Sequence, residues 1–141
     1  MADVPFGAEA ESHTAEHALE LSIEFSHGPS QPYLLRTYQV RNGHRTKVAY
    51  SQTYADRDQV REAAEALRRG LVRYGMLLGS DGRYLWQAVT GADVVATSLH
   101  GFSSLVRARS QMELVRSHVA AATITDATLR GEATDRHPRT A

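Results

Sequence analysis

Apolar and polar residues alternate most clearly over residues 19–25, where leucine, isoleucine and phenylalanine occupy every second position between glutamates and serines. A period of two with one apolar face predicts a half-buried strand. Two further strands are expected at 33–41 and 46–53, joined by Asn42-Gly43, a pair that favours the positive φ angles of a tight hairpin. A helix capped by Asp56 or Asp58 should follow and end near Gly70, since apolar residues recur there at helical spacing: Val60, Ala63, Ala64, Leu67 and Leu71.

The same order of elements recurs in the second half of the chain. Strands are expected at 72–78, 83–90 and 94–98, then a helix capped by Ser103 or Ser104, and a last short strand at 121–125. One apolar stripe runs along this second helix from Leu105 to Val119. The segment 48–51 (Val-Ala-Tyr-Ser) matches 95–98 (Val-Ala-Thr-Ser) in sequence and in its place within the pattern. Three strands and a helix, occurring twice, predict an internal duplication.

We therefore expect an α+β domain made of tandem β-β-β-α repeats that share one mostly antiparallel sheet, with two helices on one face. The single domain should span residues 18–126, with repeats at 18–70 and 71–126. Residues 1–17 and 127–141 are polar and contain too little apolar surface to support a core. We expect a flexible N-terminal tail and a disordered C-terminal tail.

A family resemblance rests on short motifs in the second half. The run Gly82-Arg83-Tyr84-Leu85-Trp86, the strand at 94–98 and Phe102-Ser103-Ser104 before a helix resemble the repeat of the YegP-like proteins, small proteins of unassigned function. The first half is similar through Asn42-Gly43, Ser51, Tyr54 and the helix from Asp56. There are three departures from the family pattern. Gly91-Ala92-Asp93 stands where the family prefers Asn-Gly, and the aromatic pair before the first hairpin is missing. A strand expected after the first helix is merged with the strand at 71–78.

The resemblance covers roughly residues 18–126. It implies strand-rich units that share one sheet, with helices on one face and terminal strands exchanged between units. It implies no reaction, because the family has no assigned chemistry and no catalytic residues to carry over.

Composition excludes several classes of function. The 141 residues include no cysteine, which rules out disulfides, thiolate catalysis and cysteine-ligated zinc. Sixteen basic and sixteen acidic residues give zero net charge, whereas a dedicated nucleic-acid binder usually has a basic excess. The first residues lack the basic and apolar regions of a signal peptide, and no apolar run is long enough to span a bilayer. We expect a cytoplasmic protein without a membrane partner.

Candidate catalytic and metal-binding groups are few. His13 and His17 would share a helix face, but a metal site needs a third ligand, so we expect neither a metal nor a cofactor. His44 or His100 could act as a general base, with Ser51, Ser98, Ser103 or Asp56 as partners by residue type alone. The segment 79–82 (Gly-Ser-Asp-Gly) leads into a strand and lacks a following Lys-Ser/Thr, which favours a turn over a phosphate loop.

Aromatic and basic side chains suggest an interaction surface instead. Tyr33, Tyr38, Tyr84 and Trp86 are interpreted as core rings, as an oligomer interface or as a platform that stacks nucleic-acid bases. If Leu34, Tyr38, Tyr84 and Trp86 face the helices, the open sheet face carries Tyr33, Leu35, Leu85 and Val89. Arginines near the first helix end either offset the helix dipole or bind a phosphate or an acidic partner. The candidate surface comprises Tyr33, Leu35, Leu85, Val89, Arg36, Arg83, Arg68, Arg69 and Arg73.

The sequence thus favours a non-enzymatic binding or structural module that acts through protein–protein contacts, with itself as a homodimer or with another protein. Two alternatives remain open. One is a single-stranded nucleic-acid binder that uses the open sheet face, and the other is a small hydrolase with a histidine base.

Overall fold

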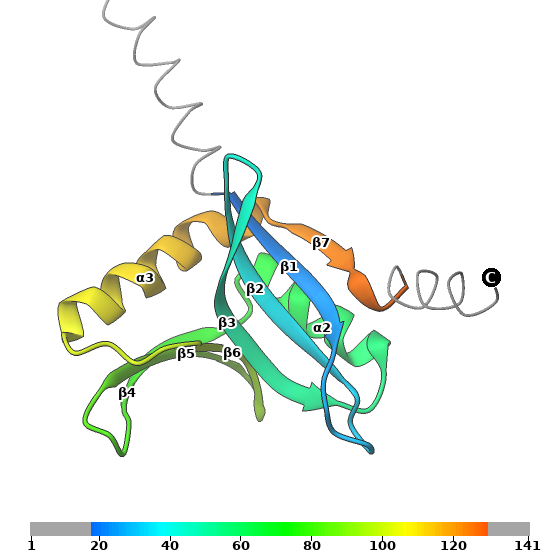
Figure 1. Cartoon of the computed structure of the whole chain (residues 1–141), viewed down its shortest axis with the longest axis horizontal. Helices are drawn as coiled ribbons and strands as arrows, with labels where there is room; N and C mark the ends of the chain where they lie inside the picture. The colour runs from blue at the N-terminus through cyan, green and yellow to red at the C-terminus, as the bar shows by residue number, and fades with distance from the viewer. Residues whose placement is uncertain (1–17, 130–141) are drawn as a thin grey trace, which may run out of the picture.

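The computed structural model describes residues 18–129, which form one seven-stranded sheet, two α-helices and one 3-10 helix (Figure 1). The elements in chain order are β1 Ala18–Phe25, β2 Tyr33–Arg41, β3 His44–Tyr54, α2 Arg57–Arg68, β4 Arg73–Leu78, β5 Tyr84–Thr90, β6 Asp93–Ser98, α3 Leu105–His118, η1 Val119–Ala121 and β7 Thr123–Asp126.

The strands lie in the order β4-β5-β6-β3-β2-β1-β7. Neighbours pair antiparallel except β7, which runs parallel to β1. The first hairpin turns at Asn42 and Gly43 with φ angles of 53° and 81°, as the sequence predicts. The α+β class and the mostly antiparallel sheet are confirmed.

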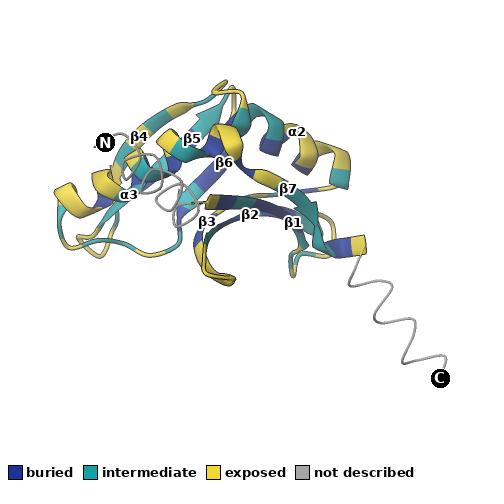
Figure 2. Ribbon diagram, turned by 90° about the horizontal axis from the view of Figure 1, so that it is seen from above, coloured by how far each residue is buried: buried dark blue, intermediate teal, exposed yellow. Residues whose placement is uncertain are grey.

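One apolar core joins the sheet to both helices (Figure 2). Leu21 and Trp86 are fully buried in it, together with Leu67 of α2 and Val115 of α3. Each helix begins at a side-chain cap, since Asp56 accepts from the Gln59 N–H and Ser104 from the Arg107 N–H. The helix stripes therefore lie on the core side, except at their ends, where Leu71 and Leu105 are exposed.

The first predicted apolar stripe is wrong at Leu71. The helix α2 ends at Arg68, and Gly70 has a φ of +72°, a conformation that turns the chain out of the helix. Leu71 therefore lies beyond the helix and is 62% exposed.

The prediction of which β2 side chains point toward the helices is wrong by one residue. Leu35 is fully buried in the core and Tyr33 packs against that core, whereas the sequence placed both on the open face. Apolar side chains occur at both odd and even positions along β2, so the pattern alone cannot determine which face is buried. Leu34, Arg36 and Tyr38 face away from the helices, because they pair with or lie beside Glu24 and Glu20 of β1.

The domain also extends past the predicted boundary at residue 126. Thr128 is fully buried, and its backbone N–H donates to Asp126 Oδ1 at 3.0 Å. Arg57 of α2 donates to the Thr128 hydroxyl at 3.3 Å. Residues 127–129 therefore belong to the structured part of the chain.

Two matching irregularities occur in the two halves. The pairing between β2 and β3 shifts register around Leu35, whose N–H donates to Ser51 Oγ at 2.8 Å. In the second half the Trp86 N–H donates to Ser98 Oγ at 3.2 Å. A serine hydroxyl thus replaces a strand carbonyl at corresponding places in each half.

Candidate functional site

The open face of the sheet over β1, β2 and β3 is covered by charged side chains. Glu24 accepts hydrogen bonds from Arg36 Nε at 3.0 Å and from the Tyr38 hydroxyl at 2.5 Å. Arg45 Nε donates to Glu20 at 2.8 Å, and the Arg45 guanidinium lies 3.8 Å from the centre of the Tyr38 ring. The side chains of Glu20 and Glu24 are only 14% and 18% exposed.

Burial is the largest cause that raises the pKa of Tyr38 to about 12, followed by its hydrogen bond to Glu24. Its hydroxyl therefore stays protonated at neutral pH and remains a donor. The charged side chains of this network bond to one another, which leaves them little to offer a partner, although the buried Ser22 Oγ of β1 has no hydrogen-bond partner among residues 18–129.

The same face is apolar over β4 and β5. Leu77 pairs directly with Leu85, and both side chains lie opposite to the buried Trp86 and Met76 face. Val89 pairs with Arg73 in β4, so Leu85, Val89 and Arg73 lie on one surface. Among residues 18–129, no ion pair involves β4, β5 or β6. We call the surface formed by Leu77, Leu85 and Val89 the apolar patch.

A groove of about 610 Å³ lies where the C-terminal ends of α2 and α3 meet the start of β4. It brings together the three arginines that the sequence singled out, and it adds Arg116 of α3, which the sequence analysis missed: Arg68, Arg69, Arg73 and Arg116. Counting from the two helix caps would have found it, because Arg116 lies at the same distance from Ser104 as Arg68 from Asp56.

Half of this positive charge is compensated. Arg68 lies 3.3 Å from Glu65, and Arg116 lies 3.5 Å from Glu113. Within the described residues, Arg69 and Arg73 have no carboxylate within 4.0 Å. The Tyr74 ring lines the groove, and burial raises the pKa of its hydroxyl, which has no hydrogen-bond partner among residues 18–129.

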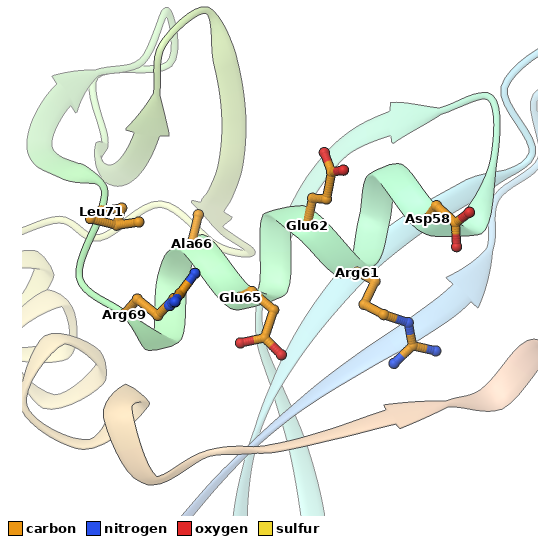
Figure 3. A pocket seen from close by; sticks show the side chains of 7 residues that line it. All are labelled: Asp58, Arg61, Glu62, Glu65, Ala66, Arg69 and Leu71. Atoms are coloured by element: carbon orange, nitrogen blue, oxygen red, sulfur yellow. The ribbon is translucent and has the colours of Figure 1, made fainter.

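A second groove, of about 500 Å³, runs along the outer side of α2 (Figure 3). Its charged lining residues lie along the helix and beyond its end: Asp58, Arg61, Glu62, Glu65 and Arg69. Arg61 and Glu65 point toward the chain around β7, whereas Glu62 points the opposite way (Figure 3). With Arg69 included, three carboxylates and two guanidinium groups line this groove, so it is slightly acidic.

Within residues 18–129, the geometry does not assemble a nucleophilic site. Ser51 and Ser98 are buried and bound to strand backbones, and Ser104 caps α3. His44 and His100 are exposed, and neither is joined to a serine or a carboxylate by a hydrogen bond within residues 18–129. No group of three metal-ligating side chains occurs in that range either, and His13 and His17 lie outside it.

The remaining predicted residues are dispersed. Arg36 faces the open side in its ion pair with Glu24, and Arg83 is exposed in the turn before β5, where its side chain packs against Gly101. Of the rings proposed to stack bases, Trp86 is fully buried and Tyr38 is 7% exposed beneath Arg45. No helix of residues 18–129 has the length and apolar character needed to cross a bilayer.

Comparisons with known proteins identify the fold. No family model and no curated protein matches the chain. Among solved structures it is similar to YegP from E. coli, a protein of unknown function, with a TM-score of 0.62 and 13% identity over 78% of this chain and 93% of that one. It is also similar to a UPF0339 protein from Shewanella oneidensis, with a TM-score of 0.61 and 15% identity over 77% of this chain and 91% of that one. The resemblance to YegP-like proteins is therefore confirmed at the level of the fold.

Proposed function

We propose that this chain is a non-enzymatic binding module made of two β-β-β-α repeats, which acts in the cytoplasm through protein–protein contacts, first of all with a second copy of itself. The repeats are supported by the paired serine bonds, Ser51 with Leu35 and Ser98 with Trp86, and by the equivalent helix caps. The absence of cysteine suits a reducing compartment.

The contrast between the two halves of the open face carries the proposal. The ion-pair network covers β1 to β3, while the apolar patch over β4 and β5 borders Arg73 but has no ion pair across it among residues 18–129. Leu77, on the β4 side of this patch, is 41% exposed. Exposed contiguous apolar surface rimmed by polar residues commonly marks an interface, and zero net charge removes long-range repulsion between copies.

Nucleic-acid binding is less well supported by the geometry. A stacking platform needs exposed ring faces on a basic surface, but Trp86 is buried and the Tyr38 ring is covered by Arg45. The hydrolase alternative lacks an oriented base–nucleophile pair within the described residues.

Sedimentation velocity at micromolar concentration tests the proposal. We expect a mass near twice 15.5 kDa, and Leu85→Glu should shift the protein to the monomer, because it puts a charge in the apolar patch. Thr46→Glu, at an exposed position of β3, is the matched control and should leave the dimer intact. A monomer at all concentrations, unaffected by Leu85→Glu, would contradict the proposal, and salt-sensitive binding of a fluorescent single-stranded oligonucleotide would favour the nucleic-acid alternative.

A further inference from the structure

A row of arginines on one flank of α2 holds the C-terminal segment of the domain. Arg68 Nη1 donates to the carbonyl of Ala122, the residue before β7, at 3.1 Å. Arg61 Nη2 lies 3.8 Å from Asp126 Oδ2 at the end of β7. Beyond the strand, Arg57 donates to the Thr128 hydroxyl. The row thus contacts the segment at its start, at the end of its strand and two residues later.

Within this segment, β7 adds to the outer edge of β1 in parallel. Leu21 pairs with Ile124, and Ile23 pairs with Asp126. Ile124 packs against the core, so the apolar residue of the strand faces the helix side and Asp126 lies on that side as well. The segment therefore places an apolar residue against the core and, two positions later, a carboxylate beside an arginine of α2.

The second half of the chain contains a place that corresponds to the one that β7 occupies beside β1 and α2. Ile23 pairs with Leu35 and Met76 with Trp86, and since Leu35 and Trp86 make the matching serine bonds, β4 corresponds to β1. Counted from the caps Asp56 and Ser104, the positions of Arg57, Arg61 and Arg68 are occupied in α3 by Leu105, Arg109 and Arg116.

Within residues 18–129, no strand lies at that corresponding place. β4 is the last strand of the sheet on its side, and among residues 18–129 no strand pairs with its outer edge. The chain passes from α2 into β4 after only four residues, so it has no strand that corresponds to β7 there. The Arg116 guanidinium lies 5.9 Å from the centre of the Tyr74 ring in β4, and the Arg109 side chain is exposed with no ion pair in the described range.

We propose that the outer edge of β4 and the flank of α3 that carries Arg109 and Arg116 form a docking site for an extended acidic segment of a partner protein, which adds to β4 as a parallel strand. Strand addition to an exposed edge is a common way to recognise peptides, in which main-chain hydrogen bonds give affinity and side-chain pockets give specificity. Arg116 already lies 3.5 Å from Glu113, whereas Arg109 has no ion pair among residues 18–129, so Arg109 favours a carboxylate over a basic residue in that segment.

The register of β7 specifies the sequence that fits. Because Tyr74 corresponds to Leu21 and Met76 to Ile23, the apolar residue of the partner lies beside Tyr74 and its carboxylate beside Met76, toward Arg109. Arg57 of α2 donates to a hydroxyl, whereas the corresponding residue of α3 is Leu105. Leu105 is 40% exposed, and its neighbour Val106 is 73% exposed. These two side chains line a groove of about 360 Å³ together with Arg109, Ser110 and Glu113, the carboxylate that lies beside Arg116. The preferred pattern is therefore apolar, any residue, acidic, any residue, apolar.

Fluorescence anisotropy with the full chain tests this site, using a labelled peptide of residues 122–129 in which Thr128 is replaced by Leu. We expect an Asp126→Asn version of the peptide to bind about three- to tenfold more weakly, the effect of losing one partly exposed ion pair. The double variant Arg109→Glu/Arg116→Glu should weaken binding at least as much. Arg107→Glu is the matched control, since its position two residues from Arg109 places it on nearly the opposite side of α3. Equal binding by the double variant and the control would overturn the proposal.

Nuclear magnetic resonance of the labelled protein locates the peptide. We expect shift changes at residues 73–78 and 105–116, and a nitroxide at the peptide C-terminus should broaden Leu78 more than Arg73, as a parallel strand requires. Changes confined to β1 would mean that the peptide displaces β7, and the proposal would fail. The docking site shares β4 with the apolar patch, where Leu77 lies, but Leu85 is in β5 and away from the outer edge of β4. Leu85→Glu should therefore leave peptide binding unchanged, so a loss of peptide binding tests the docking site and a loss of self-association tests the apolar patch.

Discussion

Removing the hydroxyl of Ser51 perturbs the bond that holds the irregular pairing between β2 and β3. Leu35 lies at the register shift, and its N–H donates to Ser51 Oγ at 2.8 Å. Ser51 is 3% exposed and donates in turn to the Gln52 carbonyl at 2.6 Å. Ser51→Ala therefore leaves the buried Leu35 N–H without a partner, while the change in side-chain volume is small.

Leaving a buried donor without a partner lowers the free energy of unfolding by about 1–3 kcal/mol. For a domain of this size, that should lower the melting temperature by roughly 3–12 °C. Ser98→Ala removes the 3.2 Å bond to the Trp86 N–H, so we expect a loss at the lower end of the same range. The two variants together test whether the same device stabilises both halves.

Urea denaturation monitored by tryptophan fluorescence is a suitable assay, because Trp86 is the single tryptophan and is fully buried in the core. Ser30→Ala, at an exposed position of the loop between β1 and β2, is the control and should change the free energy of unfolding by less than about 0.5 kcal/mol. If Ser51→Ala were as stable as that control, a water or a strand carbonyl would replace the hydroxyl, and the assigned role of the serine would be wrong.

Four further predictions address the core, the polar network, the boundary and catalysis. Leu67→Ala should cost roughly 2–5 kcal/mol in denaturant unfolding, because Leu67 is fully buried, and a near-neutral result would contradict its place in the core. The pKa of Tyr38 is raised from 10.0 to about 12, so its contribution to stability is complete below pH 10 and is lost as the pH rises through about 12; Tyr38→Phe should flatten this alkaline loss, and an unchanged pH profile would refute it. A chain cut to residues 18–129 should melt near the full-length temperature, whereas one cut to 18–126 should melt lower because it loses buried Thr128. His44→Ala and His100→Ala should fold normally and abolish no activity found in a hydrolase screen, and an activity lost in either variant would contradict the non-enzymatic proposal.

The sequence predicted strands and helices well where one face alone is apolar. β1 alternates strictly, and its leucines and isoleucine face the core as expected. β2 carries apolar residues at both parities, and the face that Leu35 takes is decided by partners far along the chain, such as Glu24 with Arg36. Such cross-strand pairs depend on register, which the sequence of one strand does not contain.

The candidate sites show the same division. The sequence found Arg68, Arg69 and Arg73 as a cluster because they are close in the chain, but it missed Arg116, which joins them only when the two helix ends meet. Thr128 looks like part of a polar tail, and its burial results from contacts with Asp126 and with Arg57 on a distant helix. Local polarity predicted exposure there, and tertiary contacts reversed it.

The parallel pairing of β7 with β1 also sets the order in which the protein can be completed on the ribosome. Thr125 of β7 donates to Glu20 of β1 across 105 positions of sequence. At a synthesis rate of about 5–20 residues per second, the outer edge of β1 waits on the order of 5–20 seconds before its neighbour emerges. During that interval a nascent first half exposes the edge that β7 later occupies, and a second nascent chain on the same messenger could pair with it. Late closure by a four-residue strand is thus the step at which correct folding competes with exchange between chains.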